Sequence, residues 1–183
     1  MTAGHLVVID MQRVFADPES PWGTPRYADA AAGVRALLPG FAGRVTFTRF
    51  LAPARPAGAW RAYYDEWSFA RQPPDARLWE LTDEFARSAD HVLDTATFGK
   101  WTPRLAERVG SDGRLVLAGV STDCCVLSTA LAAADAGTEV LVVADACAGV
   151  DDDSHLRALR TMELYRPLIR ITTIAGLRAE AGP

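Results

Sequence analysis

Two adjacent cysteines, Cys124 and Cys125, stand in the stretch GVSTDCCVLSTA, residues 119–130. A disulfide between them is disfavoured, because neighbouring α-carbons lie about 3.8 Å apart, below the usual disulfide range. A zinc site would need cysteines a few residues apart together with further cysteine or histidine ligands. The third cysteine and the three histidines show no such array. The remaining chemistry is one thiol acting as a nucleophile.

The surroundings of this cysteine pair favour a reactive thiol. The pair follows the apolar run RLVLAGV, and Thr122 or Asp123 can cap a helix that begins there, so both thiols fall in its first turn. The N–H groups and the dipole at that end favour thiolate over thiol. Neighbours on a helix point in different directions, so we expect only one thiol to face a cleft, and the spacing does not say which. Alternatively, a buried cysteine is only a small core side chain.

Asp10, in the stretch VVIDMQ, is the second group with possible chemistry. A nucleotide-binding first strand would end in a glycine-rich turn, and the residues after Asp10 contain no glycine. A phosphoryl-transfer aspartate would usually have a second carboxylate two residues on, where this chain has Gln12. Asp10 is therefore expected to be a proton acceptor at the end of a strand, with a helix N-cap as the alternative.

Strand-like and helix-like segments alternate along the whole chain. Mostly continuous apolar runs predict strands buried on both faces, at 5–10, 44–50, 91–94, 114–120, 139–145 and 168–174. Apolar residues at three- and four-residue spacing predict helices at 26–38, 76–87, 123–136 and 153–165. This order predicts one α/β domain over residues 1–183, with three αβα layers around an open six-stranded, mostly parallel sheet. Ligands of such sheets bind at the carboxyl ends of the strands, where Asp10 and the cysteine pair lie.

Two details of this pattern can be checked directly. Gly137 stands at the expected end of the third helix, and Asp153 or Ser154 at the start of the fourth. The segment 51–75 is irregular and rich in proline, alanine and aromatic residues. It predicts a pocket wall or lid, with a satellite hydrophobic cluster under a long loop as an equal alternative.

Composition limits the partners that we expect. The chain has 183 residues, 49% of them hydrophobic, and a formal net charge of -4 without clusters of basic residues. Nucleic acid and membranes are therefore not expected partners. The strand-like run that follows the first few residues leaves no room for a signal peptide, and the odd cysteine count favours a reducing, cytoplasmic setting.

Three segments together resemble a known family. VVIDMQ, GVSTDCCVLSTA and DACAGVDDDSHLRALRTM occur in the order found in the isochorismatase-like cysteine hydrolases, which include nicotinamidases and N-carbamoylsarcosine amidohydrolases. The resemblance covers essentially the whole chain and implies a Rossmann-like fold. It implies that Cys125, three residues after Thr122, is the nucleophile and that Cys124 turns towards the packing side. It also implies a cis peptide before Ser121, an oxyanion hole formed by the N–H groups of Ser121 and Cys125, and Asp10 as the general base.

The family's catalytic lysine is displaced in this chain. Aligning FGKW with the family pattern puts Thr95 where that lysine is usual, and the only lysine of the chain is Lys100, five residues later. We expect Lys100 to reach back and complete the catalytic triad. The alternative is an exposed lysine at the start of a helix.

The resemblance also bears on metal and substrate. Nicotinamidases carry metal ligands just after the second strand, where this chain has Phe50 and Ala52, and none of His5, His91 and His155 is placed to coordinate. We therefore expect neither a metal nor another cofactor, and nicotinamide is a disfavoured substrate. An apolar pocket is expected instead, with walls from Phe15, Trp22, Trp60, Tyr64, Trp67, Phe98 and Trp101, although each of these residues, taken singly, is more commonly a core residue than a wall residue.

The predicted activity is therefore metal-independent hydrolysis of a small amide, carbamoyl compound or lactam through a Cys125 acyl-enzyme. The alternatives are an enol-ether hydrolase of the isochorismatase type, a non-catalytic small-molecule binder and a thiol redox sensor, for which Cys147 is a further thiol near a strand end. The resemblance further implies a homo-oligomer, either a dimer or a tetramer.

Overall fold

A parallel sheet of six strands forms the centre of the molecule. The computed structural model describes residues 4–110 and 113–180. The strand order is β3-β2-β1-β4-β5-β6, and every neighbouring pair is parallel. The strands are β1 His5–Ile9, β2 Val45–Phe50, β3 Val92–Thr95, β4 Arg114–Val120, β5 Glu139–Ala148 and β6 Ile169–Thr172. The predicted fold class is confirmed.

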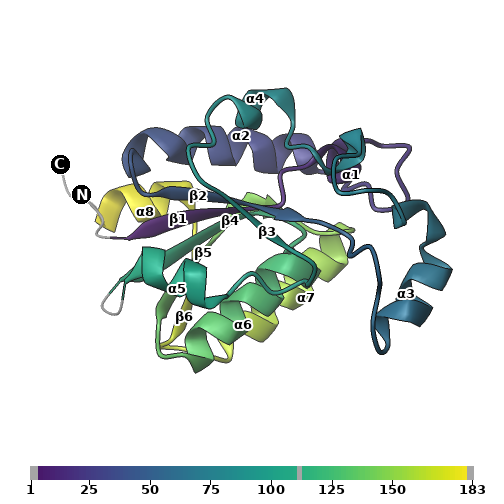
Figure 1. Cartoon of the computed structure of the whole chain (residues 1–183). Helices are drawn as coiled ribbons and strands as arrows, with labels where there is room; N and C mark the ends of the chain where they lie inside the picture. Colours follow the sequence, from purple (N-terminus) through teal and green to yellow (C-terminus); the bar gives the residue numbers. More distant parts are fainter. Residues whose placement is uncertain (1–3, 111–112, 181–183) are drawn as a thin grey trace.

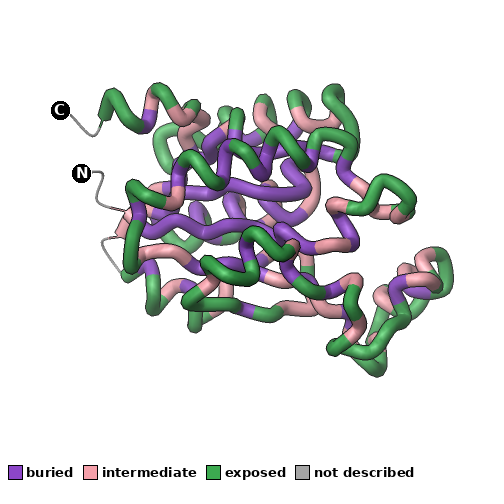
Figure 2. Tube along the Cα trace, turned by 90° about the horizontal axis from the view of Figure 1, so that it is seen from above, coloured by how far each residue is buried: buried purple, intermediate pink, exposed green. Residues whose placement is uncertain are grey.

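Helices cover both faces of this sheet (Figure 1). One face carries α2 (Tyr27–Leu37) and α8 (Ile174–Glu180), and the other carries α5 (Pro103–Val109), α6 (Leu127–Asp135) and α7 (Asp152–Glu163). Alternate residues of β1 serve the two cores: Leu6 and Val8 pack on one side, and Val7 and Ile9 on the other. The continuous apolar pattern of the strands follows from this double burial. Figure 2 shows the buried residues along the middle of the molecule.

Three shorter helices lie outside this frame: α1 (Arg13–Ala16), α3 (Trp60–Glu66) and α4 (Asp83–Ala86). The segment 51–75 contains α3 and the 3₁₀ turn Ser68–Ala70, and Figure 1 shows α3 projecting at the end of the molecule away from the two termini. Further 3₁₀ turns span Leu38–Phe41 and Arg77–Trp79. None of the helices in the described part of the chain has the length and apolar character that a bilayer crossing requires.

The prediction of one helix over 76–87 is wrong. This stretch consists of the 3₁₀ turn Arg77–Trp79 and the separate short helix α4. The backbone between them pairs instead with the segment that leaves β1: Leu81 forms an antiparallel bridge with Gln12, and the Thr82 N–H donates to the Met11 carbonyl at 3.0 Å. These bonds to a distant segment replace the local hydrogen bonds that a continuous helix would need.

Two boundaries also differ from their predictions. Helix α7 is capped by Asp151, whose carboxylate accepts the Ser154 N–H at 2.6 Å, rather than by Asp153 or Ser154. Strand β5 continues past Asp145 to Ala148, because a register shift lets it stay paired with β4. At the predicted end of α6, Gly137 has a φ of 85°, a conformation that glycine adopts at helix ends.

Close approach of β4 to β1 depends on Gly119. Its φ is 114°, and a Cβ at this position would lie 2.2 Å from the Ile9 carbonyl oxygen. A side chain here would push apart the two strands whose carboxyl ends carry Asp10 and the cysteine turn, which is the turn Thr122–Val126 that contains Cys124 and Cys125.

Candidate active site

Asp10 lies fully buried where β1 ends. Its φ of 47° is unusual for a residue with a side chain. Thr48 of β2 holds both parts of the residue, because its hydroxyl accepts the Asp10 N–H at 3.2 Å and donates to Oδ1 at 2.7 Å. The second carboxylate oxygen, Oδ2, lies 2.9 Å from Nζ of Lys100. The alternative of an N-cap role does not describe this residue, because its carboxylate is occupied by Thr48 and Lys100.

Lys100 is fully buried, so the alternative of an exposed lysine at a helix start is wrong. Besides the ion pair with Asp10, its ammonium donates to the Thr95 hydroxyl at 3.1 Å and to the Thr97 carbonyl at 2.9 Å. It also lies 5.1 Å from the centre of the Phe50 ring, within range of a cation–π contact. Lys100 thus reaches back to Thr95, the position where the resemblance had placed the lysine.

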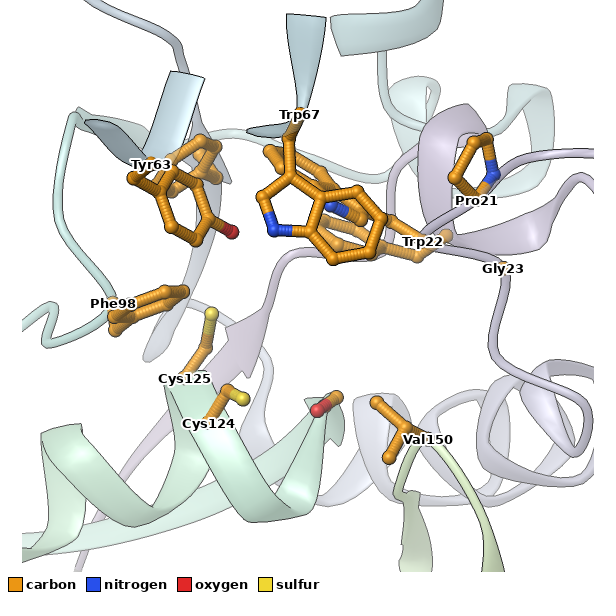
Figure 3. Close-up of a pocket in the computed structure, with 12 residues that line it drawn as sticks. Pro21, Trp22, Gly23, Tyr63, Trp67, Phe98, Cys124, Cys125 and Val150 are labelled. Atoms are coloured by element: carbon orange, nitrogen blue, oxygen red, sulfur yellow. The ribbon is translucent and has the colours of Figure 1, made fainter. Parts of the chain in front are cut away.

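Cys125 lies in a π-helical turn, Thr122–Val126, which joins β4 to α6. This turn follows the cis peptide bond between Val120 and Ser121, which the resemblance implied. Cys125 is only 3% exposed and lies at the floor of a cavity (Figure 3). Its carbonyl oxygen accepts a 2.6 Å hydrogen bond from Thr129, whose hydroxyl also accepts the Lys100 N–H at 3.0 Å. Thr129 therefore links the loop between β3 and α5, which carries Lys100, to the cysteine turn.

The expectation that the helix end favours the thiolate is wrong for the resting protein. Burial raises the pKa of Cys125 well above its usual value, and so does the negative charge of Asp10. Lys100 opposes this shift, while a hydrogen bond from the thiol to Asp10 adds to it. Desolvation disfavours the charged thiolate here because Cys125 has almost no contact with solvent. The resting thiol therefore keeps its proton and has a carboxylate within reach to accept it.

The cavity above Cys125 has a volume of about 470 Å³ and is largely aromatic. Four of the predicted wall residues line it: Phe15, Trp22, Trp67 and Phe98. Its remaining lining residues are Pro21, Gly23, Phe50, Tyr63, Ser121, Cys124, Cys125 and Val150. The segment 51–75 thus supplies one wall, and its other aromatic residues pack behind that wall.

The prediction that Trp60, Tyr64 and Trp101 line the cavity is wrong. Trp60 packs behind the wall, with its ring centre 5.4 Å from that of Phe98, and Tyr64 is fully buried 6.1 Å from Trp60. Trp101 packs against the core on the α6 side of the sheet. The sequence alone does not distinguish a loop aromatic residue that faces a cavity from one that packs behind the cavity wall. Tyr63 and Tyr64 are neighbours in α3 and therefore point in different directions. Only the orientation of this helix would have identified Tyr63, rather than Tyr64, as the wall residue.

Cys124 does not turn away from the cavity, as the resemblance had implied. It is half-buried and lines the cavity beside Cys125 (Figure 3). Burial, with the nearby charge of Asp123, raises the pKa of Cys124 to about 11. The cavity extends over the start of the turn towards Ser121 and Val150, so it reaches two successive side chains. The expectation that only one thiol faces the cleft is therefore wrong.

Gln12 has a structural role that the sequence did not indicate. This fully buried amide accepts the Phe50 N–H at 2.8 Å and donates to the carbonyls of Phe50 and Trp79 at 3.0 and 2.8 Å. It therefore fixes the end of β2, and with it the Phe50 ring, against the segment after β1. A polar side chain two residues after Asp10 was the only signal for this.

Comparison with known proteins decides the family. A model of the isochorismatase domain matches residues 5–175. This chain belongs to the isochorismatase family. Isochorismatase domain-containing protein 2 of Xenopus laevis is 42% identical to this family member over 69 residues, which are 36% of the chain and 34% of that protein. The match thus spans about a third of the Xenopus protein.

Solved structures of isochorismatase-like proteins share the fold. A cysteine hydrolase from Pseudomonas syringae pv. phaseolicola has a TM-score of 0.82 at 20% identity, over 98% of this chain and 93% of its own. An isochorismatase family protein from Desulfovibrio vulgaris has the same score and identity over 99% of both chains. A nicotinamidase from Staphylococcus aureus has a TM-score of 0.70 at 18% identity, over 94% of this chain and all of its own. At 18–20% identity, these structures show that the chain shares their fold.

The residues that occupy the positions of the nicotinamidase metal ligands cannot coordinate a metal in this family member. Phe50 lines the cavity and Ala52 is buried in the core, and neither side chain offers a ligand atom. The histidines lie elsewhere: Nε2 of His5 pairs with Thr46, and Nδ1 of His155 pairs with Thr122 at 2.8 Å. Within residues 4–110 and 113–180, no group of three or more His, Cys, Asp and Glu side chains is arranged to hold an ion.

Proposed function

We propose that this protein is a metal-independent cysteine hydrolase that cleaves a C–N bond of a small amide, carbamoyl compound or lactam. The observation that carries the proposal is the buried pair of Asp10 and Lys100, 2.9 Å apart, next to the nearly inaccessible sulfur of Cys125. A buried ion pair is a costly arrangement that stability alone does not favour. Placed beside a thiol at a cavity floor, it has the composition of a catalytic triad.

In the proposed reaction, Asp10 accepts the proton of the Cys125 thiol as the sulfur attacks the carbonyl carbon of the substrate. The N–H groups of Ser121 and Cys125 stabilise the oxyanion, and Lys100 stabilises the negative charge that passes between sulfur and carboxylate. The protonated Asp10 then gives its proton to the leaving nitrogen as the C–N bond breaks, and a thioester remains. Water loses a proton to Asp10, attacks the thioester, and releases the acid and the Cys125 thiol.

The proposal is tested by turnover and by trapping the thioester. The protein is incubated with primary amides and ureido compounds while ammonia release is measured, and intact mass detects the acyl adduct. Cys125→Ala is expected to abolish both signals, while the matched variant Cys124→Ala keeps at least a tenth of the turnover. The reverse pattern would assign the nucleophile to Cys124. Loss of activity on treatment with a chelator would contradict metal independence.

The proposed partners follow from the same reasoning. The substrate is a small molecule, while nucleic acid and membrane surfaces are not partners of a chain with a net charge of -4. We propose a homo-oligomer and a cytoplasmic location, which sedimentation and cell fractionation would test.

A further inference from the structure

The described residues that line the cavity carry no charged side chain. Aromatic lining residues include Trp22, Tyr63, Trp67 and Phe98, and the polar groups of the lining belong to neutral side-chain types. Tyr63 stays a neutral phenol, because burial raises its pKa, as do the nearby Tyr64 and the two thiols of the cysteine turn. A ligand in this space therefore meets apolar rings and a few neutral hydrogen-bonding groups.

The Lys100 cation near the cavity floor is not available to a ligand. The Lys100 ammonium is fully buried and already has Asp10, Thr95 and Thr97 as partners, one for each of its three protons. A substrate carboxylate in the cavity would have to replace one of these partners. It would also lie near Asp123, which binds Ser121 at the cavity lining. The surroundings thus disfavour an anionic substrate group.

The walls offer ring faces and edges to a flat, apolar group. Trp22 is the centre of the cluster, with ring centres 5.1 Å from Phe69, 5.7 Å from Phe50 and 5.9 Å from Tyr63. Phe98 packs nearly parallel to Phe50 at 6.3 Å. These contacts fix the walls before a ligand binds, so little conformational entropy is lost on binding. Aromatic pairs of this kind favour aromatic guests over aliphatic ones of equal size.

Two neutral polar groups lie on the α3 side of the cavity. Figure 3 shows the hydroxyl of Tyr63 and the indole nitrogen of Trp67 directed into the space above the Cys125 sulfur. Both can donate a hydrogen bond, and neither can neutralise a carboxylate. They suit a neutral carbonyl, amide or nitro-like oxygen on the substrate.

We propose that the substrate of this site is an uncharged amide whose acyl part carries a carbocyclic aromatic ring, and that carboxylate-bearing amides and ureido acids are excluded. The volume of about 470 Å³ accommodates one substituted ring together with the scissile amide. Specificity then comes from Trp22, Tyr63, Trp67 and Phe98. This inference rests on the proposed cysteine hydrolase activity and narrows its substrate class.

Matched compounds test the charge and the ring separately. The pair 4-nitrophenylacetamide and 4-carboxyphenylacetamide has nearly the same shape and differs in charge, and kcat/KM is measured by ammonia release. We expect the neutral compound to be preferred by at least about 100-fold, because an unpaired buried carboxylate is poorly tolerated. Cyclohexylacetamide is expected to fall about 3- to 10-fold below phenylacetamide. Equal or better turnover of the carboxylate, or of a 4-trimethylammonio analogue, would overturn the proposal.

An engineered charge gives the converse test. Val150 lines the cavity and is 47% exposed, so Val150→Arg adds a guanidinium at the mouth without a buried charge. It is expected to improve kcat/KM for the carboxylate compound at least 10-fold. The matched control Leu156→Arg alters a residue of equal exposure (49%) that does not line this cavity, and it should change neither compound by more than 2-fold. An equal effect of both variants would show long-range attraction only and contradict the inference.

Binding to the inactive protein separates this inference from the proposed function. In Cys125→Ala, quenching of tryptophan fluorescence reports binding without turnover. Preference for the neutral aromatic amide in binding, without turnover by the unmodified protein, would support the pocket assignment and reject the hydrolase. Turnover that favours carboxylate-bearing amides would support the hydrolase and reject the substrate class.

Discussion

The Cys125 thiol receives opposite influences from its two charged neighbours. Asp10 raises its pKa and Lys100 lowers it, while burial sets the main shift upward. A thiol whose pKa is raised is protonated at neutral pH, so its reactivity depends on transfer of the proton to Asp10 rather than on a resting thiolate. This differs from a cysteine activated by a helix end alone, and it makes the two neighbours separable by substitution.

We predict that Lys100→Met and Asp10→Asn move alkylation of Cys125 in opposite directions along the pH axis. Removing the lysine removes the charge that favours thiolate, so the alkylation profile shifts to higher pH. Removing the aspartate charge shifts it to lower pH. Both variants are expected to lose about 10²- to 10⁴-fold in turnover. Iodoacetamide labelling read by peptide mass, in a Cys124→Ala background, measures the profiles.

The double variant Asp10→Asn/Lys100→Met controls for folding. Each single substitution leaves one buried charge without its partner, at a cost of about 3–5 kcal/mol in unfolding free energy. The double variant has no such charge and is expected to recover most of that stability while remaining inactive. If either single variant keeps full turnover, the triad assignment is wrong.

At the scale of elements, the loop that carries Lys100 is bonded to the cysteine turn. The resemblance placed the lysine at Thr95 on β3, whereas the structure brings Lys100 to the same place from the following loop. Thr129 in α6 holds this arrangement together by accepting the Lys100 N–H and donating to the Cys125 carbonyl. Its place four residues after Cys125 is visible in the sequence, but its contact with a loop 29 residues upstream is not.

We predict that Thr129→Val lowers turnover about 10-fold or more, while Thr129→Ser restores at least half of it. Valine has the same shape but leaves the buried Lys100 N–H without its acceptor, at a cost of about 1–3 kcal/mol in unfolding free energy. The loss should appear in kcat rather than KM, because the threonine does not line the cavity. The control Thr138→Val alters a buried threonine beyond the other end of α6. Equal losses in both variants would reduce Thr129 to a stabilising residue.

At the element scale, the sequence predicted elements with a repeating burial pattern and missed single contacts between distant segments. Burial of β1 on both faces repeats along its length, so the run HLVVI identified it as a central strand. The segment 76–87 has helical spacing, yet its backbone bonds to the exit of β1. Likewise, the choice between Trp60 and Tyr63 for the cavity wall depends on how α3 is turned against Phe50 and Phe98. Such pairings between distant segments leave no periodic trace in the chain.

At the scale of the whole molecule, the candidate catalytic residues and the contacts that join strands lie at opposite ends of the sheet. The carboxyl ends of β1, β2 and β4 carry Asp10, Thr48 and the cysteine turn, whereas the opposite end carries contacts that join strands. There, Arg170 of β6 binds Glu139 of β5 and Glu180 of α8, and His5 of β1 binds Thr46 of β2 at 2.8 Å. Stability can therefore be changed at one end without touching the chemistry at the other.

His5 gives the clearest expected pH effect on stability. Burial lowers its pKa to about 4, with smaller contributions from the charges of Arg108, Arg44 and His91. Between pH 6.5 and about 4 the unfolded chain binds a proton at this residue that the folded chain does not, so the unfolding free energy falls as the pH falls. We predict that His5→Gln removes on the order of 2 kcal/mol of this loss, a figure reduced from the full shift because part of the effect is screened by solvent. Urea unfolding of His5→Gln and of the unmodified protein, each at pH 7 and at pH 4.5, measures it. An unchanged pH dependence in His5→Gln would show that groups elsewhere in the molecule set its acid stability.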